Sequence, residues 1–406
     1  MDLDLIRKLA IPADTKIVFL VMDGLGGLPL EPEGLTELET ACTPNLDSLA
    51  QRSVSGCALP LGAGITPGSG PGHLALFGYD PFRYVIGRGV LEALGIDFDL
   101  GPQDVAGRGN FCTVDSEGKV TDRRAGRIAT ETCVRLTSLL RENVRLPGVE
   151  LFIEPVKEHR FVLVLRGTGL AGDVTESDPQ QPGVNPLTIT PIPGATDPAA
   201  SQRTADLVNE FSAQARRILS SEPAANMVLL RGLDRRPSIP TMQEAFGLRA
   251  AAIAVYPMYR GLAKLVGMTA LPSGTKLADE FDTLERAWPQ HDFFYLHFKY
   301  TDSRGEDGDF AAKVAMIEEF DQYVPRVMAL KPDVVVVTGD HSTPALMKGH
   351  SWHPVPSLLH SRFCRCDGTQ LFGERACARG ALGTFASVDL MPLALANALR
   401  LAKYGA

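Results

Sequence analysis

Residues 16–24 read KIVFLVMDG and residues 333–341 read DVVVVTGDH, and these two stretches decide the fold. Each is a run of β-branched and other apolar residues that ends at an aspartate beside a glycine. Near-continuous apolar runs of this length are typical of strands that are buried on both faces of a largely parallel sheet. The sequence therefore predicts strands over residues 17–22 and 334–337, each with a carboxylate at its carboxyl end.

Other parts of the chain continue this pattern. Three further apolar runs are NMVLLRG at residues 226–232, AAIAVYP at residues 251–257 and DFFYLHFKYTD at residues 292–302. Amphipathic segments between the runs predict helices over residues 43–53, 309–330 and 387–401. Thr43 is a candidate N-cap, with Pro44 at the first helical position. Strands that alternate with helices predict an α/β fold with a mostly parallel sheet flanked by helices.

The segment 104–183 has a different pattern. An alternating strand, an Asp-Ser-Glu-Gly turn, a second strand, a helix and two more strands follow one another. This order predicts a compact α+β domain inserted into a main domain of residues 1–103 and 184–406. Residues 176–198, rich in Pro, Gly, Asp and Thr, are expected to form the loop that returns the chain to the main sheet.

The composition excludes several classes of protein. The chain has 406 residues, with 40 Lys and Arg against 48 Asp and Glu, so its formal net charge is −8. It contains no Lys/Arg-rich block, which argues against a nucleic-acid partner. No apolar run approaches the roughly 20 residues of a membrane span, and the N-terminus lacks the apolar core of a signal peptide. We expect a cytoplasmic protein with a small-molecule substrate, and the composition leaves a homo-oligomer open.

The seven cysteines are scattered without regular spacing, so we expect reduced thiols. Cys364-Arg365-Cys366 would be half of a zinc site, but no second Cys or His pair follows at ligand spacing. Ordinary free thiols are therefore the favoured interpretation.

We expect the functional residues where the strands end, because ligands of open α/β sheets bind beyond the carboxyl ends of the strands. Asp23 follows the first strand, Asp302 follows a strand over residues 293–300, and Asp340 and His341 follow the last. A single aspartate after a strand is usually a turn or cap residue, but three such residues are harder to explain in that way. Converging carboxylates repel one another unless cations are bound, so convergence itself favours a metal site.

Histidines support the metal interpretation. Four of the eight lie within twenty residues after the last strand: His341, His350, His353 and His360. Carboxylate and neutral imidazole together form the ligand set of Zn, Mn or Fe sites. Two others, His297 on an apolar strand and His159 near a strand, are expected to be core or surface residues.

Residues 66–73 read TPGSGPGH, a glycine-rich loop that leads into an apolar run. Glycines let a phosphate approach the backbone, and Ser69 at a helix N-terminus would meet the positive end of the helix dipole. A serine is a weak nucleophile unless a metal ion or a base lowers its pKa, and the metal set would do this. The loop matches neither a Walker A motif nor a nucleophile elbow, and residues 24–27 lack the third glycine of a dinucleotide fingerprint.

Basic residues are the third feature. They are Arg108, Arg123, Arg124, Arg127, His159 and Arg160 in the inserted segment, with Arg260 and Lys264 after a core strand. An arginine fork matches carboxylate and phosphate oxygens in pairs. Taken singly, each arginine is expected to form a solvated surface pair; taken as a set, they would bind a small phosphorylated acid.

These motifs resemble those of the archaeal-type cofactor-independent (2,3-bisphosphoglycerate-independent) phosphoglycerate mutases, in the alkaline phosphatase superfamily. The resemblance covers nearly the whole chain. It is carried by FLVMDGLGG, TPNLD at 43–47, GSGPGHLALFGYDP with GRGVLEALG, RGNF, DRRAGR, LVGM, and TGDHSTP followed by His350 and HPVP. It implies an alkaline-phosphatase-like sheet, two divalent ions (Mn²⁺ or Mg²⁺, with Zn²⁺ as an alternative), a phosphoserine intermediate, and neither 2,3-bisphosphoglycerate nor a nucleotide.

The resemblance also implies roles for individual residues. One ion would be held by Asp23, Ser69, Asp340 and His341, and the other by Asp302 and His350. Ser69 would be the nucleophile that takes the phosphoryl group from 3-phosphoglycerate and returns it to form 2-phosphoglycerate. Arg260 and Lys264 would assist catalysis, and the inserted domain would close the site against water. The substrate would be bound by His73, Arg108, Arg123, Arg124, Arg127 and His159.

One position departs from the family pattern Asp-x-x-x-His. The chain has Asp302-Ser-Arg-Gly-Glu306, and a carboxylate ligand shifts preference toward harder ions such as Mg²⁺. We hypothesise that His353 restores a nitrogen ligand. Two alternatives stay open: a metal-dependent phosphatase or phosphotransferase that acts on another small phosphorylated metabolite, and a binding protein with a degraded metal site.

Overall fold

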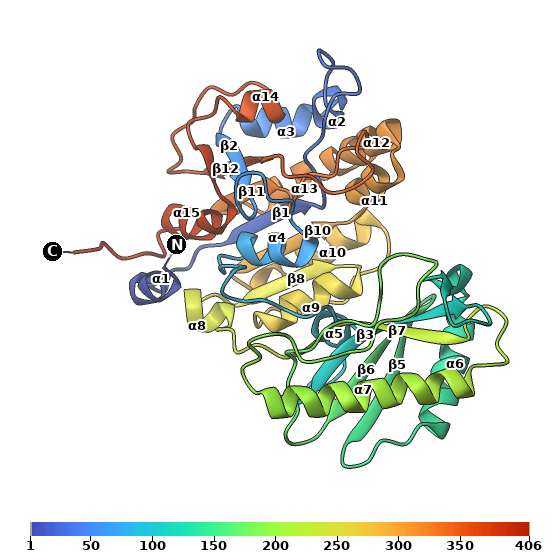
Figure 1. Ribbon diagram of the computed structural model, residues 1–406. Coiled ribbons are helices and arrows are strands. Elements are labelled where there is room, and N and C mark those ends of the chain that lie inside the picture. The colour runs from blue at the N-terminus through green and yellow to red at the C-terminus, as the bar shows by residue number, and fades with distance from the viewer. Residues whose placement is uncertain (1, 406) are drawn as a thin grey trace. The chain divides into compact units, whose positions relative to one another are not determined.

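The computed structural model describes residues 2–405, which form two compact units (Figure 1). The first unit contains the described residues up to Val85 and from Ile239 onward, and the second unit is Ile86–Ser238. None of the described helices is long and apolar enough to cross a membrane. All seven cysteines are free, as expected.

The first unit is built on an eight-stranded, mostly parallel sheet, as predicted. Its order is β13-β2-β12-β11-β1-β10-β8-β9. The strands are β1 (Ile17–Met22), β2 (Val54–Leu59), β8 (Ala250–Ala254), β9 (Thr269–Ala270), β10 (Phe293–Phe298), β11 (Val334–Thr338), β12 (Val355–Ser361) and β13 (Gly383–Ala386). Only β12 runs antiparallel to its neighbours, β11 and β2. The central strand β1 lies between β10 and β11 and is parallel to both.

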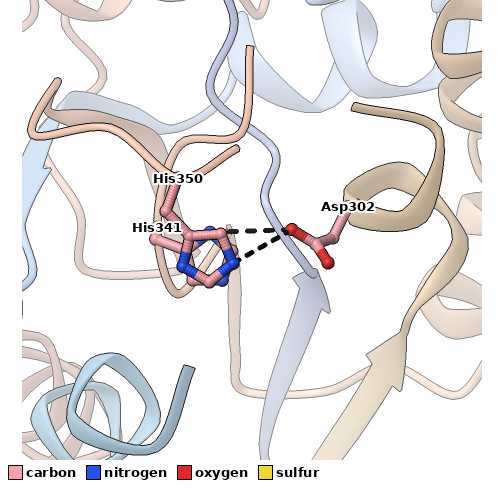
Figure 2. Close-up of side chains that lie close together, drawn as sticks. All are labelled: Asp302, His341 and His350. Atoms are coloured by element: carbon pink, nitrogen blue, oxygen red, sulfur yellow. Dashed lines mark ion pairs between the residues drawn. The ribbon is translucent and has the colours of Figure 1, made fainter. Parts of the chain in front are cut away.

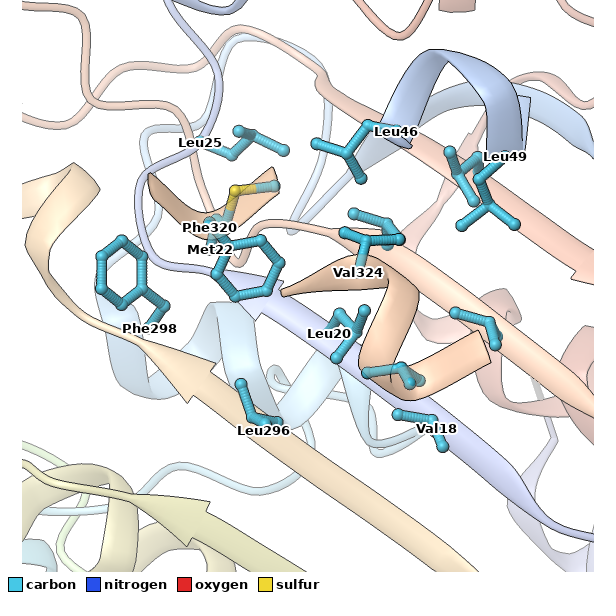
Figure 3. Close-up of a cluster of buried hydrophobic side chains, with 14 of the residues drawn as sticks. Val18, Leu20, Met22, Leu25, Leu46, Leu49, Leu296, Phe298, Phe320 and Val324 are labelled. Carbon is cyan, nitrogen blue, oxygen red and sulfur yellow. The ribbon is translucent and has the colours of Figure 1, made fainter. Parts of the chain in front are cut away.

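Helices cover both faces of this sheet. They are α1 (Leu3–Leu9), α2 (Glu37–Thr40), α3 (Pro44–Ala50), α4 (Ser69–Leu76), α8 (Met242–Phe246), α9 (Pro257–Leu265), α10 (Leu277–Ala287), α11 (Tyr300–Asp307), α12 (Phe310–Asp321), α13 (Val324–Ala329), α14 (Glu374–Cys377) and α15 (Leu390–Asn397). Strand side chains alternate between the two faces, so Val18, Leu20 and Met22 all point toward one layer of helices. There they pack with Leu46 of α3 and Phe320 of α12 (Figure 3).

The predicted helices are present with adjusted ends. The helix expected over residues 43–53 is α3, and Thr43 occupies its N-cap position without a side-chain capping hydrogen bond. The helix expected over residues 309–330 is split into α12 and α13, with a proline in the first turn of α13. Proline lacks an N–H donor, which favours a new helix start at that point. The helix expected over residues 387–401 is a 3₁₀ turn followed by α15.

The second unit has its own antiparallel sheet and core. Its strands are β3 (Val105–Val114), β4 (Val120–Asp122), β5 (Glu150–Lys157), β6 (Arg160–Arg166) and β7 (Met227–Arg235), and its helices are α5 (Arg88–Gly95), α6 (Thr130–Asn143) and α7 (Pro198–Ile218). Strand β3 pairs with β4, β6 and β7. Buried side chains from this sheet, α6 and α7 form one cluster.

The second unit is larger than the predicted insertion of residues 104–183. The strand NMVLLRG was expected in the main sheet, but it is β7 and pairs antiparallel with β3. An apolar run alone shows that a strand is buried and not which sheet buries it, so this assignment was wrong. The segment 176–198 is irregular, as predicted, yet it leads into α7 of the same unit and not back to the main sheet.

Candidate functional site

Two groups of potential metal ligands lie at the carboxyl ends of the central strands of the first unit. Asp23, Asp340 and His341 form one group, and Asp302, His341 and His350 form the other; within each group the ligand atoms lie within 4.8 Å of one another. His341 belongs to both groups. All of these side chains are buried except His350, which is half-buried. The convergence predicted from the strand ends is therefore present.

The first group surrounds His341 Nε2. This atom lies 3.1 Å from Asp340 Oδ2, 3.3 Å from Asp23 Oδ1 and 3.3 Å from Ser69 Oγ. Ser69 is the first residue of α4, so its hydroxyl sits at the helix N-terminus. Asp23 Oδ1 and Asp340 Oδ2 are buried without a hydrogen-bond donor among the described residues. Buried carboxylate oxygens without donors are costly, and a divalent cation removes that cost, so this donor set fits a metal ion.

The second group faces Asp302. Figure 2 shows the His341 and His350 side chains beside this carboxylate. The two rings are stacked, and their centroids lie 3.7 Å apart. His350 Nε2 lies 3.6 Å from Asp302 Oδ1. His350 Nδ1 donates to the Pro67 carbonyl at 2.9 Å, and a carbonyl only accepts. The proton therefore sits on Nδ1, and Nε2 presents a lone pair toward Asp302, as a metal-binding imidazole requires.

Thr343 connects the two groups, and the sequence interpretation missed it. Its hydroxyl donates to Asp302 Oδ1 at 2.6 Å and accepts from His341 Nδ1 at 2.9 Å. With the His341 proton on Nδ1, the Nε2 lone pair faces Asp23, Asp340 and Ser69. Thr343 lies inside the motif TGDHSTP, so its proximity in sequence was the one available signal.

Three more residues contact Asp23 that were not assigned to the site. Tyr259 donates a hydrogen bond to Asp23 Oδ2. Lys299 Nζ lies 3.0 Å from the same oxygen and also bonds Asp302 Oδ2, and His297 Nε2 lies 3.2 Å away. Burial raises the pKa of Asp23, but Lys299, His297 and His341 together hold this pKa well below its usual range. Asp23 is therefore ionised and ready to bind a cation.

His73 was expected to bind substrate, but its place in the structure favours a different role. The side chain is fully buried, and Nδ1 lies 2.8 Å from the Ser69 carbonyl and 3.1 Å from Asp340 Oδ2. The ring packs against those of Tyr259 and His297. His73 thus lies beneath the site, where it ties the backbone of Ser69 to Asp340. His297 is a buried core residue, as predicted, although it also borders Asp23.

Glu306 and His353 stand apart from the two groups. Glu306 Oε1 lies 3.9 Å from His350 Nε2, and its side chain is 56% exposed. Burial and the charge of Asp302 raise the pKa of Glu306. His353 Nδ1 instead hydrogen-bonds Ser351 Oγ at 3.0 Å, and the ring stacks on Trp352. Among residues 2–405, His353 joins neither group, so the hypothesis that it restores a nitrogen ligand finds no support.

Arg260 and Lys264 lie one turn apart on α9, and both are partly buried. Burial lowers the pKa of Lys264. The same helix carries Tyr259, which bonds Asp23, so α9 borders the first group.

Basic side chains gather in the second unit. His159 is buried, and its pKa is lowered to about 4 by burial and by the charges of Arg160, Arg108, Arg124 and Arg127. Arg108 is itself mostly buried, with Glu92 Oε1 3.3 Å from its Nε. Burial is the main cause of this low pKa, and the neighbouring arginine charges add to it; those charges suit an anionic ligand.

Not every predicted arginine is available to this cluster. Arg123 makes a two-pronged pair with the buried Asp178, at 2.9 and 2.7 Å, which occupies its guanidinium. Arg124 and Arg127 are exposed and form no ion pair with any residue that the structure describes.

An unusual turn holds Arg124 and Arg127. The Asp122 carboxylate accepts hydrogen bonds from Arg124 N and Gly126 N, both at 2.7 Å. Ala125, Gly126 and Arg127 have φ of 47°, 64° and 54°, in the left-handed region. Consecutive residues there are rare, and such strain clusters at ligand-binding turns.

The fold and the two ligand groups define an α/β protein with a candidate cation centre at the carboxyl edge of its sheet. The sequence model described as 2,3-bisphosphoglycerate-independent phosphoglycerate mutase matches residues 50–225. A relative from Thermus thermophilus named "Probable 2,3-bisphosphoglycerate-independent phosphoglycerate mutase" is 52% identical and covers 100% of both chains. A relative of the same name from Aquifex aeolicus is 49% identical, with 100% of both chains covered.

Solved structures agree. A protein from Pyrococcus horikoshii has a TM-score of 0.82 at 28% identity and covers 97% of this chain and 99% of its own. The "Cofactor-Independent Phosphoglycerate Mutase" from Thermoplasma acidophilum has a TM-score of 0.68 at 30% identity, with 94% and 100% covered. The chain belongs to the family of 2,3-bisphosphoglycerate-independent phosphoglycerate mutases, as its motifs indicate.

Proposed function

We propose that this chain interconverts 3-phosphoglycerate and 2-phosphoglycerate through a phosphoserine at Ser69, without 2,3-bisphosphoglycerate, in a site that holds two divalent cations. Membership of the family supports the substrate and the independence from the bisphosphate. The observation that carries the phosphoserine step is the position of Ser69 Oγ, 3.3 Å from His341 Nε2 inside the first ligand group.

The donor sets indicate which residues would hold the cations. Asp23, Asp340, His341 and Ser69 would hold one, and Asp302 and His350 would hold the other. Mn²⁺ matches this mixture of carboxylate and imidazole ligands, the carboxylates also suit Mg²⁺, and Zn²⁺ is an alternative. When bound, such ions polarise phosphoryl oxygens and lower the pKa of a coordinated hydroxyl.

The protein's own residues account for the group transfer. Ser69 Oγ forms a bond to phosphorus as the bond between phosphorus and the ester oxygen of 3-phosphoglycerate breaks. Ser69 loses its proton in this step, and the departing glycerate oxygen gains one and becomes a hydroxyl. The neighbouring glycerate hydroxyl then attacks the phosphoserine: its oxygen forms a bond to phosphorus, the Ser69 Oγ–phosphorus bond breaks, and the proton that the hydroxyl loses balances the one that Ser69 regains. The N-terminus of α4 stabilises the negative charge on Ser69 in both steps. Water must be excluded, because it would hydrolyse the phosphoserine.

The basic cluster of the second unit is proposed to bind the anionic groups of the substrate. Arg124 and Arg127 present guanidinium groups on a strained turn, and Arg108 contributes to the positive potential there. His159, whose pKa is lowered to about 4, is neutral near pH 7 and would contribute a ring N–H donor and not a charge. Arg123 is assigned a structural role because Asp178 occupies it.

Replacing the nucleophile tests this proposal. Ser69→Ala should abolish the interconversion and the phosphoprotein that mass spectrometry detects after mixing with 3-phosphoglycerate. Ser48→Ala, on an exposed turn of α3, is the matched control and should retain both signals. Full activity in Ser69→Ala would refute the phosphoserine mechanism.

The same assay separates the alternative function. Glu306 in place of the family histidine is the feature that favours a phosphatase or another phosphotransferase. Release of inorganic phosphate from 3-phosphoglycerate, with no 2-phosphoglycerate formed, would identify that function instead.

A further inference from the structure

Lys313 is a fully buried lysine on α12 that the proposed chemistry does not use. Its Nζ donates to three backbone carbonyls, those of Gly24 at 3.0 Å, Gly26 at 3.0 Å and Thr343 at 2.9 Å. An ammonium group carries three N–H donors, so every donor has an acceptor. A buried charge is costly unless it is paired and fully hydrogen-bonded, and this environment meets that condition.

The three carbonyls belong to the segments that carry the first ligand group. Gly24 and Gly26 follow Asp23 at the end of β1, and Thr343 follows His341 at the end of β11. Thr343 N also donates to the Gly24 and Gly26 carbonyls, at 3.2 and 3.0 Å. One ammonium group therefore joins both ligand-bearing segments close to their ligands.

Two carboxylates, the buried Glu37 and the half-buried Glu374, favour the charged form of Lys313 and hold the same segments. Glu37 Oε1 lies 3.9 Å from Lys313 Nζ and accepts a hydrogen bond from Ala345 N at 2.7 Å. Glu374 Oε1 accepts a hydrogen bond from Gly27 N at 2.9 Å. Burial lowers the pKa of Lys313, and the charges of Glu37 and Glu374 oppose this. The network spans the segments after β1 and β11, and both side chains of its central pair, Lys313 and Glu37, are fully buried.

We propose that Lys313 is a positioning residue: a tethered cation that fixes the segments after β1 and β11 and so preorganises Asp23, Asp340 and His341 for a divalent ion. It acts through backbone carbonyls and not through a bond to that ion. The inference rests on the proposed metal site, but it concerns the affinity of the protein for a cation and not the reaction.

Lys313→Met tests this role, because methionine keeps an unbranched apolar stem and removes the charge and the donors. Isothermal titration of the purified chain with Mn²⁺ should show a Kd raised by about 10- to 100-fold, the range found when partners of metal ligands are removed. Equal Mn²⁺ affinity in the wild type and in a folded Lys313→Met variant overturns the proposal.

Lys16→Met is the matched control. Lys16 Nζ donates to two carbonyls, those of Trp288 at 2.8 Å and His291 at 2.7 Å, at the opposite end of β1 from Asp23. Its loss should lower thermal stability and leave the Mn²⁺ Kd unchanged. An equal fall in Mn²⁺ affinity in both variants would mean that each lysine only stabilises the fold, and a positioning role would be excluded.

Chemical rescue gives an independent test if the methionine variant does not fold. Lys313→Ala removes the atoms that n-propylammonium contains, so this ion should restore Mn²⁺ affinity, whereas 1-propanol at the same concentration should not. Rescue by neither additive overturns the proposal. Failure of the wild type to bind Mn²⁺ would overturn both this inference and the metal part of the proposed function, while normal wild-type binding with no effect of Lys313 overturns this inference alone.

Discussion

Two hydrogen-bond acceptors, a backbone carbonyl and a threonine hydroxyl, determine which nitrogen of His350 and of His341 could bind a metal ion. The Pro67 carbonyl accepts a hydrogen bond from His350 Nδ1, and the Thr343 hydroxyl accepts one from His341 Nδ1, so the proton of each imidazole stays on Nδ1. Both Nε2 atoms are therefore left as acceptors that face carboxylates. Neither Pro67 nor Thr343 belongs to the two candidate ligand groups, yet each fixes the tautomer of a histidine that does.

We expect Thr343→Val to weaken Mn²⁺ binding by about 10- to 100-fold, because the isosteric valine breaks the link from His341 to Asp302. Thr343→Ser keeps the hydroxyl and should bind Mn²⁺ as the wild type does. Titration calorimetry of both variants measures the difference, and equal affinity for the valine and serine variants would contradict the role given to the hydroxyl.

His159 makes the second unit sensitive to acid. Its pKa in the folded chain is about 4, below the usual value of 6.5, so the unfolded chain binds a proton more readily. The contribution of His159 to the free energy of unfolding should therefore be fully present above pH 6.5 and decline as the pH falls from 6.5 toward 4. Denaturant unfolding at about pH 7 and about pH 5 should show a smaller loss in His159→Gln than in the wild type.

The same histidine also reports anion binding. A phosphate ion bound among Arg108, Arg124 and Arg127 would raise the pKa of His159, which an NMR titration with and without inorganic phosphate would detect. An unchanged titration curve would place the anion elsewhere.

At the scale of elements, α4 lies directly against the end of β11. A Cβ atom added at Gly72 would come within 2.4 Å of the Asp340 carbonyl oxygen, so no larger residue fits between the helix and this ligand. The glycine allows the helix that begins with Ser69 to approach the strand end that carries Asp340 and His341.

Gly72→Ala should displace α4, lower the free energy of unfolding by about 1–3 kcal/mol and reduce the rate of interconversion. Gly62→Ala is the matched control, because its Cβ would meet only Ile65 Cδ1, at 3.5 Å. Urea denaturation and the coupled mutase assay should show a loss of stability and of activity in Gly72→Ala and not in Gly62→Ala. A normal free energy of unfolding in Gly72→Ala would show that α4 can shift without loss of stability.

The strands and helices also show which parts of the fold and of the candidate site could be predicted from the sequence. Strands β1, β10 and β11 were predictable because burial on both faces requires unbroken apolar runs. The convergence of the aspartates that follow them was also predictable, although Asp302 lies in the first turn of α11 and not directly after β10. The membership of β7 in the second sheet was not, because sheet pairing depends on partners distant in sequence. A similar reason explains why Tyr259, Lys299 and Thr343 were missed. Tyr259 and Lys299 contact Asp23, which is far away in the chain, and Thr343 contributes a hydroxyl that no ligand motif requires.

At the scale of the whole molecule, the site accounts for part of the acidic charge. Asp23, Asp302 and Asp340 contribute three of the eight excess negative charges, and Glu306, which stands apart from both ligand groups, adds a fourth nearby; two divalent ions would cancel these four charges. Sequence alone predicts that the metal-free site repels an anionic substrate. The contacts of Lys299 with Asp23 and Asp302 reduce that repulsion.

All of the candidate ligands lie in the first unit, so metal binding should stabilise the two units unequally. Mn²⁺ at about 100 times its Kd should stabilise the first unit by about 2.7 kcal/mol per bound ion and leave the unfolding of the second unit unchanged. Differential scanning calorimetry with Mn²⁺ and with a chelator checks this. A uniform shift of the whole transition would show instead that the units unfold together.

The sheet order has a consequence for how the protein is made. Strand β1 pairs only with β10 and β11, and β2 only with β12 and β13, so the sheet partners of both early strands are translated last. The second unit, whose strands pair among themselves, is synthesised in between and has every partner it needs. During translation these two apolar strands therefore have no sheet partner until late in synthesis. Unpaired apolar strands are prone to aggregation, from which chaperones protect nascent chains. A translation product that stops before Phe293 would contain a complete second unit and would lack four of the candidate ligands, Asp302, Asp340, His341 and His350.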